Sequence, residues 1–141
     1  MSVMDVTGAV LALLPDMPAP VWRNLEPGEA DQPPWIIASC TTGGHTRGEG
    51  GGMSAHEGTL EVRAVTTTVD GVNVWCDDML IPMLDMHRPS QPDGHQVGPL
   101  ALVDDSGAYC AGLTADDTAR RWAVRVLRFR FHWNRIQPTT S

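Results

Sequence analysis

Lysine is absent from this chain of 141 residues, so all ten basic residues are arginines. They stand against 17 acidic residues and leave a formal net charge of −7 at pH 7. Proteins that bind nucleic acid through its phosphate groups need clustered basic residues. The composition therefore argues against specific nucleic-acid binding.

Cysteine is scarce as well. The three cysteines, Cys40, Cys76 and Cys110, are odd in number and widely separated. This pattern excludes a framework of paired disulfides and favours a reducing compartment. Because each cysteine lies in an apolar run, we expect all three to be buried as small hydrophobic residues.

Long apolar runs are also missing. No stretch of about 18 apolar residues occurs, so we expect no membrane span. The N-terminus carries Asp5 where a secretory signal would be basic. We expect one domain over residues 1–136, made in the cytoplasm and large enough to bury a core, followed by a disordered tail over residues 137–141.

The spacing of the apolar residues predicts two helices. A stripe at intervals of three and four predicts a helix over residues 2–14, which Pro15 ends. A second stripe predicts a helix over residues 69–86 with aspartates on its wet side. Pro82 falls inside this second pattern and predicts a kink or an early end.

The other apolar runs predict strands. Short strands are expected at residues 21–25 and 35–40, and the alternation over residues 59–69 predicts a longer one. Residues 100–105 and 107–113 are expected to form a hairpin around the turn sequence DDSG.

The C-terminal stretch RRWAVRVLRFRFHWNRI predicts the longest strand. Its apolar residues change phase near Leu127 and Arg128. This change predicts either a β-bulge at that point or a strand that changes its packing partner.

The glycine-rich stretch CTTGGHTRGEGGGMSAHEG, residues 40–58, separates two expected strands and predicts a hairpin with a long tip at residues 41–57. Gly43 and Gly48 have the spacing of a phosphate-binding loop. However, Glu49 stands where that loop requires a lysine, and a strand follows in place of a helix. We therefore expect a flexible hairpin tip and no nucleotide.

No motif predicts a catalytic or metal site. The histidines lack ligand-pair spacing, and the sequence His56–Glu57 lacks the second histidine of a metalloprotease helix. No cysteine lies in a recognisable nucleophile elbow. Neighbouring aspartates on a helix diverge, so they are poorly placed to share a proton. A cysteine or metal site assembled by the fold, in a small enzyme or ligand-binding module, stays an open alternative.

Charge is unevenly spread along the chain. Residues 1–86 have a balance of −9, and residues 87–141 have a balance of +2. Such a layout suits a subunit whose acidic surface meets a neighbour's basic surface. Among the tryptophans, Trp75 and Trp122 are expected in the core. The remaining tryptophans, Trp22, Trp35 and Trp133, are candidate interface anchors.

These elements predict an α+β fold, in which a small mixed or antiparallel sheet carries two main helices and a long protruding β-hairpin loop. Their order resembles that of the tail terminator proteins of long-tailed bacteriophages, particularly phages that infect GC-rich actinobacteria. The resemblance covers most of the chain as a pattern of elements. It is carried by VMDVTGAVLALL, by PWIIASC with GTLEVRAVTTT, by DGVNVWCDDMLIPML and by ARRWAVRVLRFRF.

The resemblance implies a structural virion protein at the head-proximal end of the phage tail, not an enzyme, and without a cofactor or metal. Six copies would form a ring that caps the tail tube, ends its polymerisation and provides the surface for head–tail joining. The implied partners are further copies of the chain, the major tail tube protein and head–tail connector or head-completion proteins, with DNA passing through the ring. Other neck proteins of similar size are the nearest alternative.

The surfaces expected to meet these partners are the hairpin tip and the last strand. The residues expected there are Arg47, Glu49, Met53, His56, Arg128, Arg130 and Trp133.

Overall fold

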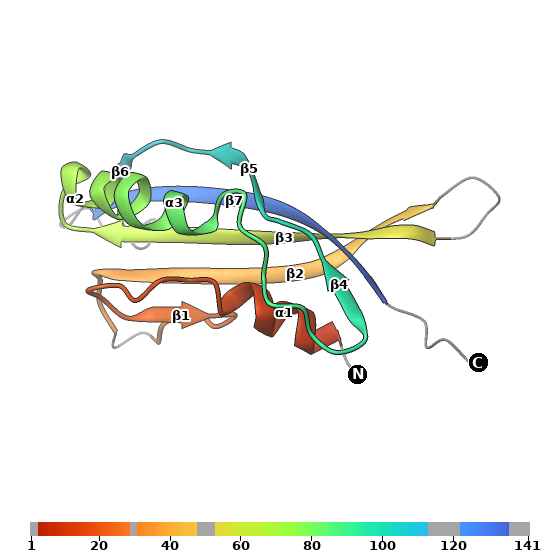
Figure 1. Cartoon of the computed structure of the whole chain (residues 1–141). Coiled ribbons are helices and arrows are strands. Elements are labelled where there is room, and N and C mark those ends of the chain that lie inside the picture. The colour runs from red at the N-terminus through yellow and green to blue at the C-terminus, as the bar shows by residue number, and fades with distance from the viewer. Residues whose placement is uncertain (1–2, 29–30, 48–52, 113–121, 136–141) are drawn as a thin grey trace, which may run out of the picture.

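The computed structural model describes residues 3–28, 31–47, 53–112 and 122–135, and within these it gives the backbone alone for Val3, 43–47 and 53–55. The described residues form one seven-stranded mixed sheet with helices on one face (Figure 1). This arrangement confirms the predicted α+β class.

Three long strands run side by side through the middle of the sheet (Figure 1). They are β2 (Trp35–Arg47), β3 (Met53–Thr66) and β7 (Trp122–Arg135), and each neighbouring pair is antiparallel. The short strand β1 (Val21–Arg23) adds to the outer side of β2 in parallel. It ends at Asn24, which has a positive φ of 52° and whose Oδ1 accepts a hydrogen bond from the Cys40 N–H at 2.6 Å.

The opposite side of β7 is paired three times in succession. The strands β4 (His95–Val97), β5 (Ala101–Asp105) and β6 (Tyr109–Ala111) each pair antiparallel with β7, one after another along its length. The hairpin expected around DDSG is therefore wrong, because the chain keeps its direction through this segment. Ser106 explains the difference, since it exchanges hydrogen bonds with Val126 on β7 before Gly107, at φ +68°, leads into β6.

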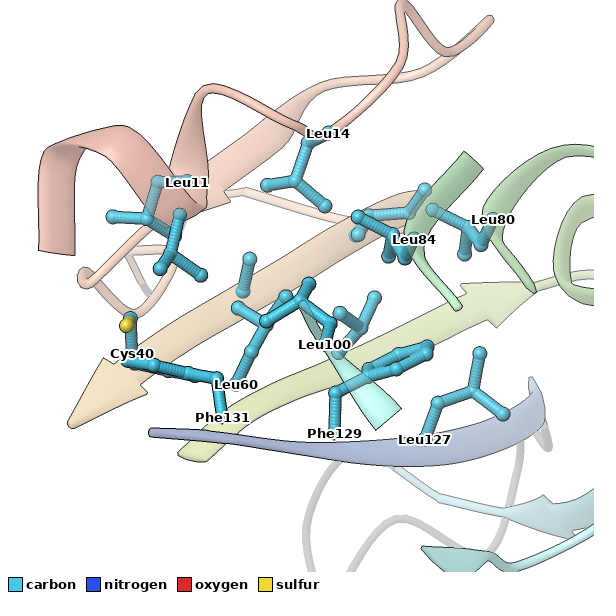
Figure 2. Close-up of a cluster of buried hydrophobic side chains, with 14 of the residues drawn as sticks. Leu11, Leu14, Cys40, Leu60, Leu80, Leu84, Leu100, Leu127, Phe129 and Phe131 are labelled. Carbon is cyan, nitrogen blue, oxygen red and sulfur yellow. The ribbon is translucent and has the colours of Figure 1, made fainter. Parts of the chain in front are cut away.

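Two helical segments cover one face of the sheet. The first is α1 (Val3–Leu11), whose end passes into a tight turn with i→i+3 hydrogen bonds before Pro15. The second is a continuous run of α2 (Val69–Asn73), the π-helix η1 (Val74–Leu80) and α3 (Ile81–Leu84). Both pack on the same core cluster, and Figure 2 shows leucines from each segment near Leu127, Phe129 and Phe131 of β7.

The second helix differs from its expected form in the width of its turns. Its fully buried residues, Val72, Cys76, Leu80 and Leu84, recur at every fourth position. A π-helix bonds i to i+5 and so makes wider turns than an α-helix. Pro82, which has no N–H to donate to the preceding turn, lies at the start of α3, just after the π-helix. The helical run continues two residues past the proline and ends at Leu84.

The last strand contains no bulge against β3. Its pairing with β3 is unbroken from His56 opposite Trp133 to Thr66 opposite Ala123. The irregularity lies on β5, where Val103 is the extra residue between two paired positions. The change of phase in the sequence reflects the second predicted cause, a change of packing partner, because Leu127 and the aromatic residues after it face the helices.

The long hairpin loop expected at residues 41–57 is not confirmed. Strand pairing continues from Thr41 opposite Thr59 to Arg47 opposite Met53, with two register shifts on the way. Residues 48–52 lie outside the described residues, as does the expected tail at 137–141.

Candidate functional site

The two faces of the sheet are covered differently. Ile36, Ala38 and Ala64 point toward the helices and belong to the main core. Their neighbours Trp35, Ile37 and Val65 point to the other face, as side chains in strands alternate, and belong to a second, separate apolar cluster. Neither helical segment contributes to this second cluster.

An open groove of about 730 Å³ lies on this second face. Its floor is apolar and comes from three strands, with Trp35 and Ile37 on β2, Val65 on β3 and Val124 and Val126 on β7. One wall is lined by residues 26–28 and Asp31, and the other by Tyr109, Ala111 and Gly112. We call this feature the sheet-face groove. Its volume falls in the range of clefts that hold ligands or partner side chains, about 300–1,000 Å³.

Charged side chains stand at the rim of the sheet-face groove. Glu61, Arg63 and Arg128 line it from the strands, while Glu26 and Asp31 line the opposite wall. The carboxylate of Glu61 lies 3.5 Å from the Arg128 guanidinium and 3.9 Å from that of Arg63. Arg128 is also paired with Asp104 at 2.8 Å, so both rim arginines already have carboxylate partners within the chain.

The tryptophans at this end of the sheet contribute unmet donors. The indole N–H groups of Trp22, Trp35 and Trp122 are buried and have no hydrogen-bond partner. An unmet buried donor costs about 1–3 kcal/mol. Burying these three indole rings therefore costs part of the stability that their apolar packing contributes.

A buried arginine ties β5 and the second helical segment to β7. Arg125 donates to both carboxylate oxygens of Asp105 on β5, at 3.0 and 2.6 Å, and to the side-chain oxygen of Asn73 on α2 at 3.0 Å. A second carboxylate, that of Asp77 on η1, lies 3.0 Å away. The hydrogen bonds from Arg125 hold the pKa of Asp105 below its usual value. One side chain therefore fixes β5 and the helix to β7.

The two adjacent aspartates of β5 serve different partners. Asp105 binds Arg125 on the helix side of β7, whereas Asp104 accepts a 2.8 Å hydrogen bond from Arg128 at the groove rim. Their carboxylates therefore diverge, and they do not form a proton-sharing pair.

The residues expected at an interface do not lie together on one surface. Arg128 lines the sheet-face groove, and Arg130 is exposed on the same strand between Thr59 and Ala101. His56 stacks on Trp133 with ring centroids 4.4 Å apart, and Trp133 is only 4% exposed, within the core. The side chains of Arg47 and Met53, and all of Glu49, lie outside the described part.

The other tryptophans also lie in different parts of the fold. Trp122 is buried, but in the second cluster and not under the helices, and Trp75 packs half-buried against the main core. Trp35 is buried on the groove floor, and Trp22 is half-buried beside it.

Two of the three thiols are unsuited to nucleophilic attack. Burial raises the pKa of Cys40 and of Cys76 to about 12, so both stay protonated at neutral pH. Cys110 is exposed, so the expectation that it is buried is wrong. Its short strand, β6, pairs with β7, and both Tyr109 and Cys110 on it are exposed. Among the described residues, no three histidine, cysteine, aspartate or glutamate side chains are grouped to hold a metal ion.

The groove itself was missed by reasoning from sequence. Of its floor residues only Trp35 is singled out by the sequence, as a candidate interface anchor, because nothing local shows that one face of a sheet lacks a helix. The sequence does carry one signal of a second apolar face, the phase change in β7. There Trp122, Val124 and Val126 precede Arg128 and Arg130 on the same face of the strand.

No helix within the described ranges is long and apolar enough to cross a membrane. In comparisons with known proteins, the chain matches no family model, and no curated protein sequence is significantly similar to it.

Proposed function

We propose that this chain is a structural subunit of a phage virion, a tail terminator that assembles as a ring on the head-proximal end of the tail tube. In this role it ends tube polymerisation and offers the surface to which the head joins. Its partners are further copies of itself, the major tail tube protein and a head–tail connector or head-completion protein.

The sheet-face groove is the observation that carries this proposal. The second cluster lies on the sheet face that neither described helical segment covers, and its buried side chains are only 3–8% exposed. Beside it, the sheet-face groove offers a concave site of a size that can hold part of a second molecule. In a closed assembly, a neighbouring subunit would occupy this site.

The order of elements supports the same role. The resemblance rests on a helix, a short strand, a long strand pair, a second helix and a long last strand. The described residues follow that order from α1 to β7. The two buried thiols, with their raised pKa values, add no catalytic group to compete with an assembly role.

The proposal is tested by polymerising the major tail tube protein of the same phage with and without the purified chain. Tube lengths are measured by electron microscopy. We expect shorter tubes with one ring-shaped cap per tube when the chain is added at the start of polymerisation. Tubes that grow to the same length in both samples would refute the terminator role. A ring that binds the head connector but leaves tube length unchanged would assign the chain to another neck position.

A further inference from the structure

The paired strands give the sheet-face groove a length and a direction. Trp35, Val65 and Val124 are directly paired across β2, β3 and β7. Tyr109 on β6 is paired with Val124 in turn, and all four side chains line the groove. Neighbouring strands lie about 4.8 Å apart, so the row from Trp35 to Tyr109 is about 14 Å long. An extended segment of about four residues covers the same length.

The walls of the groove offer more accessible surface than its floor. The buried floor residues are only 3–8% exposed, so covering them further removes little more apolar surface from water. On the β6 side, by contrast, Tyr109 is 44% exposed. On the side where the chain enters β2, Glu26 and Asp31 are exposed. Recognition of an occupant therefore depends on these two walls.

The arginines at the rim are neutralised within the chain. Arg128 pairs with Asp104 at 2.8 Å and with Glu61 at 3.5 Å, and Arg63 lies 3.9 Å from the same glutamate. Two arginines thus stand against two carboxylates, and this part of the rim has no net charge. It therefore does not decide the sign of the charge that an occupant carries.

The wall beside β2 carries charge that the described chain leaves unneutralised. Glu26 and Asp31 form no ion pair with any residue in the part of the chain that the structure describes. Asp31 Oδ2 accepts a 2.9 Å hydrogen bond from the Gly28 N–H, which holds this carboxylate at the wall. The two carboxylates make the groove lining negative, so a positively charged occupant is favoured and an acidic one is disfavoured.

We propose that the sheet-face groove binds a basic, extended segment of a neighbouring protein. An arginine of that segment lies at Glu26 and Asp31, and an apolar residue lies against the ring of Tyr109. A guanidinium presents a fork of N–H donors that matches carboxylates, which favours arginine over lysine at this wall. The length of the row sets these two residues about three positions apart in the segment.

This inference rests on the proposed function, which makes the groove a docking site, and it adds the chemistry of the docked segment. Exposed ion pairs contribute little affinity each, so the contact is weak for a short segment. It should weaken further as salt is raised, because the charges at the wall are exposed to solvent. Selectivity for a positive charge is therefore the property to measure.

The probe is a tetrapeptide blocked at both ends, with leucine first, two serines, and arginine last. Its matched control has citrulline in place of arginine, which keeps the shape of the side chain and removes the charge. Isothermal titration calorimetry gives the affinity, and the NMR signals of the indole N–H groups report binding beside Trp35. We expect the wild type to bind the citrulline peptide at least about threefold more weakly than the arginine peptide.

Two variants of equal charge test the acidic wall, with circular dichroism to check folding. The groove variant carries Glu26→Gln with Asp31→Asn, whose amide oxygen can still accept from the Gly28 N–H. The control carries Asp16→Asn with Asp78→Asn, at exposed positions outside the groove. The groove variant should bind the arginine peptide at least about threefold more weakly and lose the preference over citrulline. The control should bind both peptides as the wild type does.

A third variant tests the apolar end of the contact. Tyr109→Ala removes the exposed ring from the wall on the β6 side. It should weaken the binding of both peptides by the same factor, because both carry the leucine. The preference for arginine over citrulline should stay as it is in the wild type.

Some results would overturn the proposal. These are no binding of the arginine peptide, equal binding of the two peptides by the wild type, or unchanged binding by the groove variant. Blocked arginine alone, if it bound as tightly as the tetrapeptide, would show a site for a small cation and not for a segment. Peptide binding with no effect on tube length would refute only the terminator role, and capping without peptide binding would refute only this inference.

Discussion

At the scale of single residues, Arg125 is the side chain on which the most contacts converge. Its side chain is only 9% exposed, and it binds groups from α2, η1 and β5. A buried cation is tolerated only where it is paired and hydrogen-bonded. Asp105, Asp77 and Asn73 together meet that condition, which explains how a charged residue can face the helices from the middle of β7.

Replacing this arginine should destabilise the chain. We expect Arg125→Met to lower the free energy of unfolding by about 1–3 kcal/mol. The loss stays below that of a fully buried pair because the side chains of Asp105 and Asp77 are 30% and 55% exposed. Urea denaturation measures the change. Arg128→Met is the matched control, since this exposed arginine should cost no more than about 1 kcal/mol, and equal losses in both variants would contradict the argument.

The Asp105 carboxylate should also make stability depend on pH. Its pKa is lowered from 3.8, chiefly by the hydrogen bonds from Arg125. A carboxylate with a depressed folded pKa stabilises the fold above its unfolded pKa, and this contribution is lost as the pH falls through the folded value. The wild type should therefore lose more stability below pH 3.8 than Asp105→Asn does.

Chemical denaturation at a series of pH values checks this expectation. Asp93→Asn serves as the control, because Asp93 is exposed and forms no ion pair among the described residues. Its acid dependence should follow the wild type. If Asp105→Asn also followed the wild type, the pairing with Arg125 would have no part in acid stability.

At the scale of elements, the close packing of β3 against β7 requires a glycine at position 58. Gly58 on β3 lies directly opposite Phe131 on β7, and the Phe131 ring occupies the space that a Cβ at position 58 would need. Phe131 is 1% exposed in the core, so its ring has little room to move. The glycine therefore lets an aromatic side chain lie flat across the neighbouring strand.

Two glycine substitutions should consequently have opposite effects. Gly58→Ala should destabilise the chain by about 1–3 kcal/mol, because it overpacks the core. Gly8→Ala in α1, where no atom lies within 4 Å of the added Cβ, should stabilise it by about 0.5–1 kcal/mol through helix propensity. Thermal unfolding of both variants provides the comparison. A loss of stability in both would indicate that Gly8 has a contact beyond those described.

At the scale of the whole molecule, the fold cancels much of the charge separation seen along the chain. Arg125 meets Asp77 and Arg128 meets Glu61, so arginines of the C-terminal half neutralise parts of the acidic N-terminal half. The acidic half is thus not a separate face.

The amino-acid sequence by itself determined the fold class, the two helical segments and the positions of the long strands, because apolar periodicity is a local property that packing then follows. It also identified Cys40 and Cys76 as buried. It failed at the turn DDSG and at Cys110, because the direction of β5 and β6 depends on β7, which lies later in the chain.

Only the tertiary structure decided which face of the sheet each tryptophan occupies and which of the arginines is buried. Trp122 and Arg125 lie three residues apart on one strand, but they face different layers whose identity depends on distant elements. The groove arises in the same way, since its floor comes from three strands and its walls from two further segments. Local sequence patterns carry the alternation of side chains, whereas the presence or absence of a covering layer is set by contacts between residues far apart in the chain.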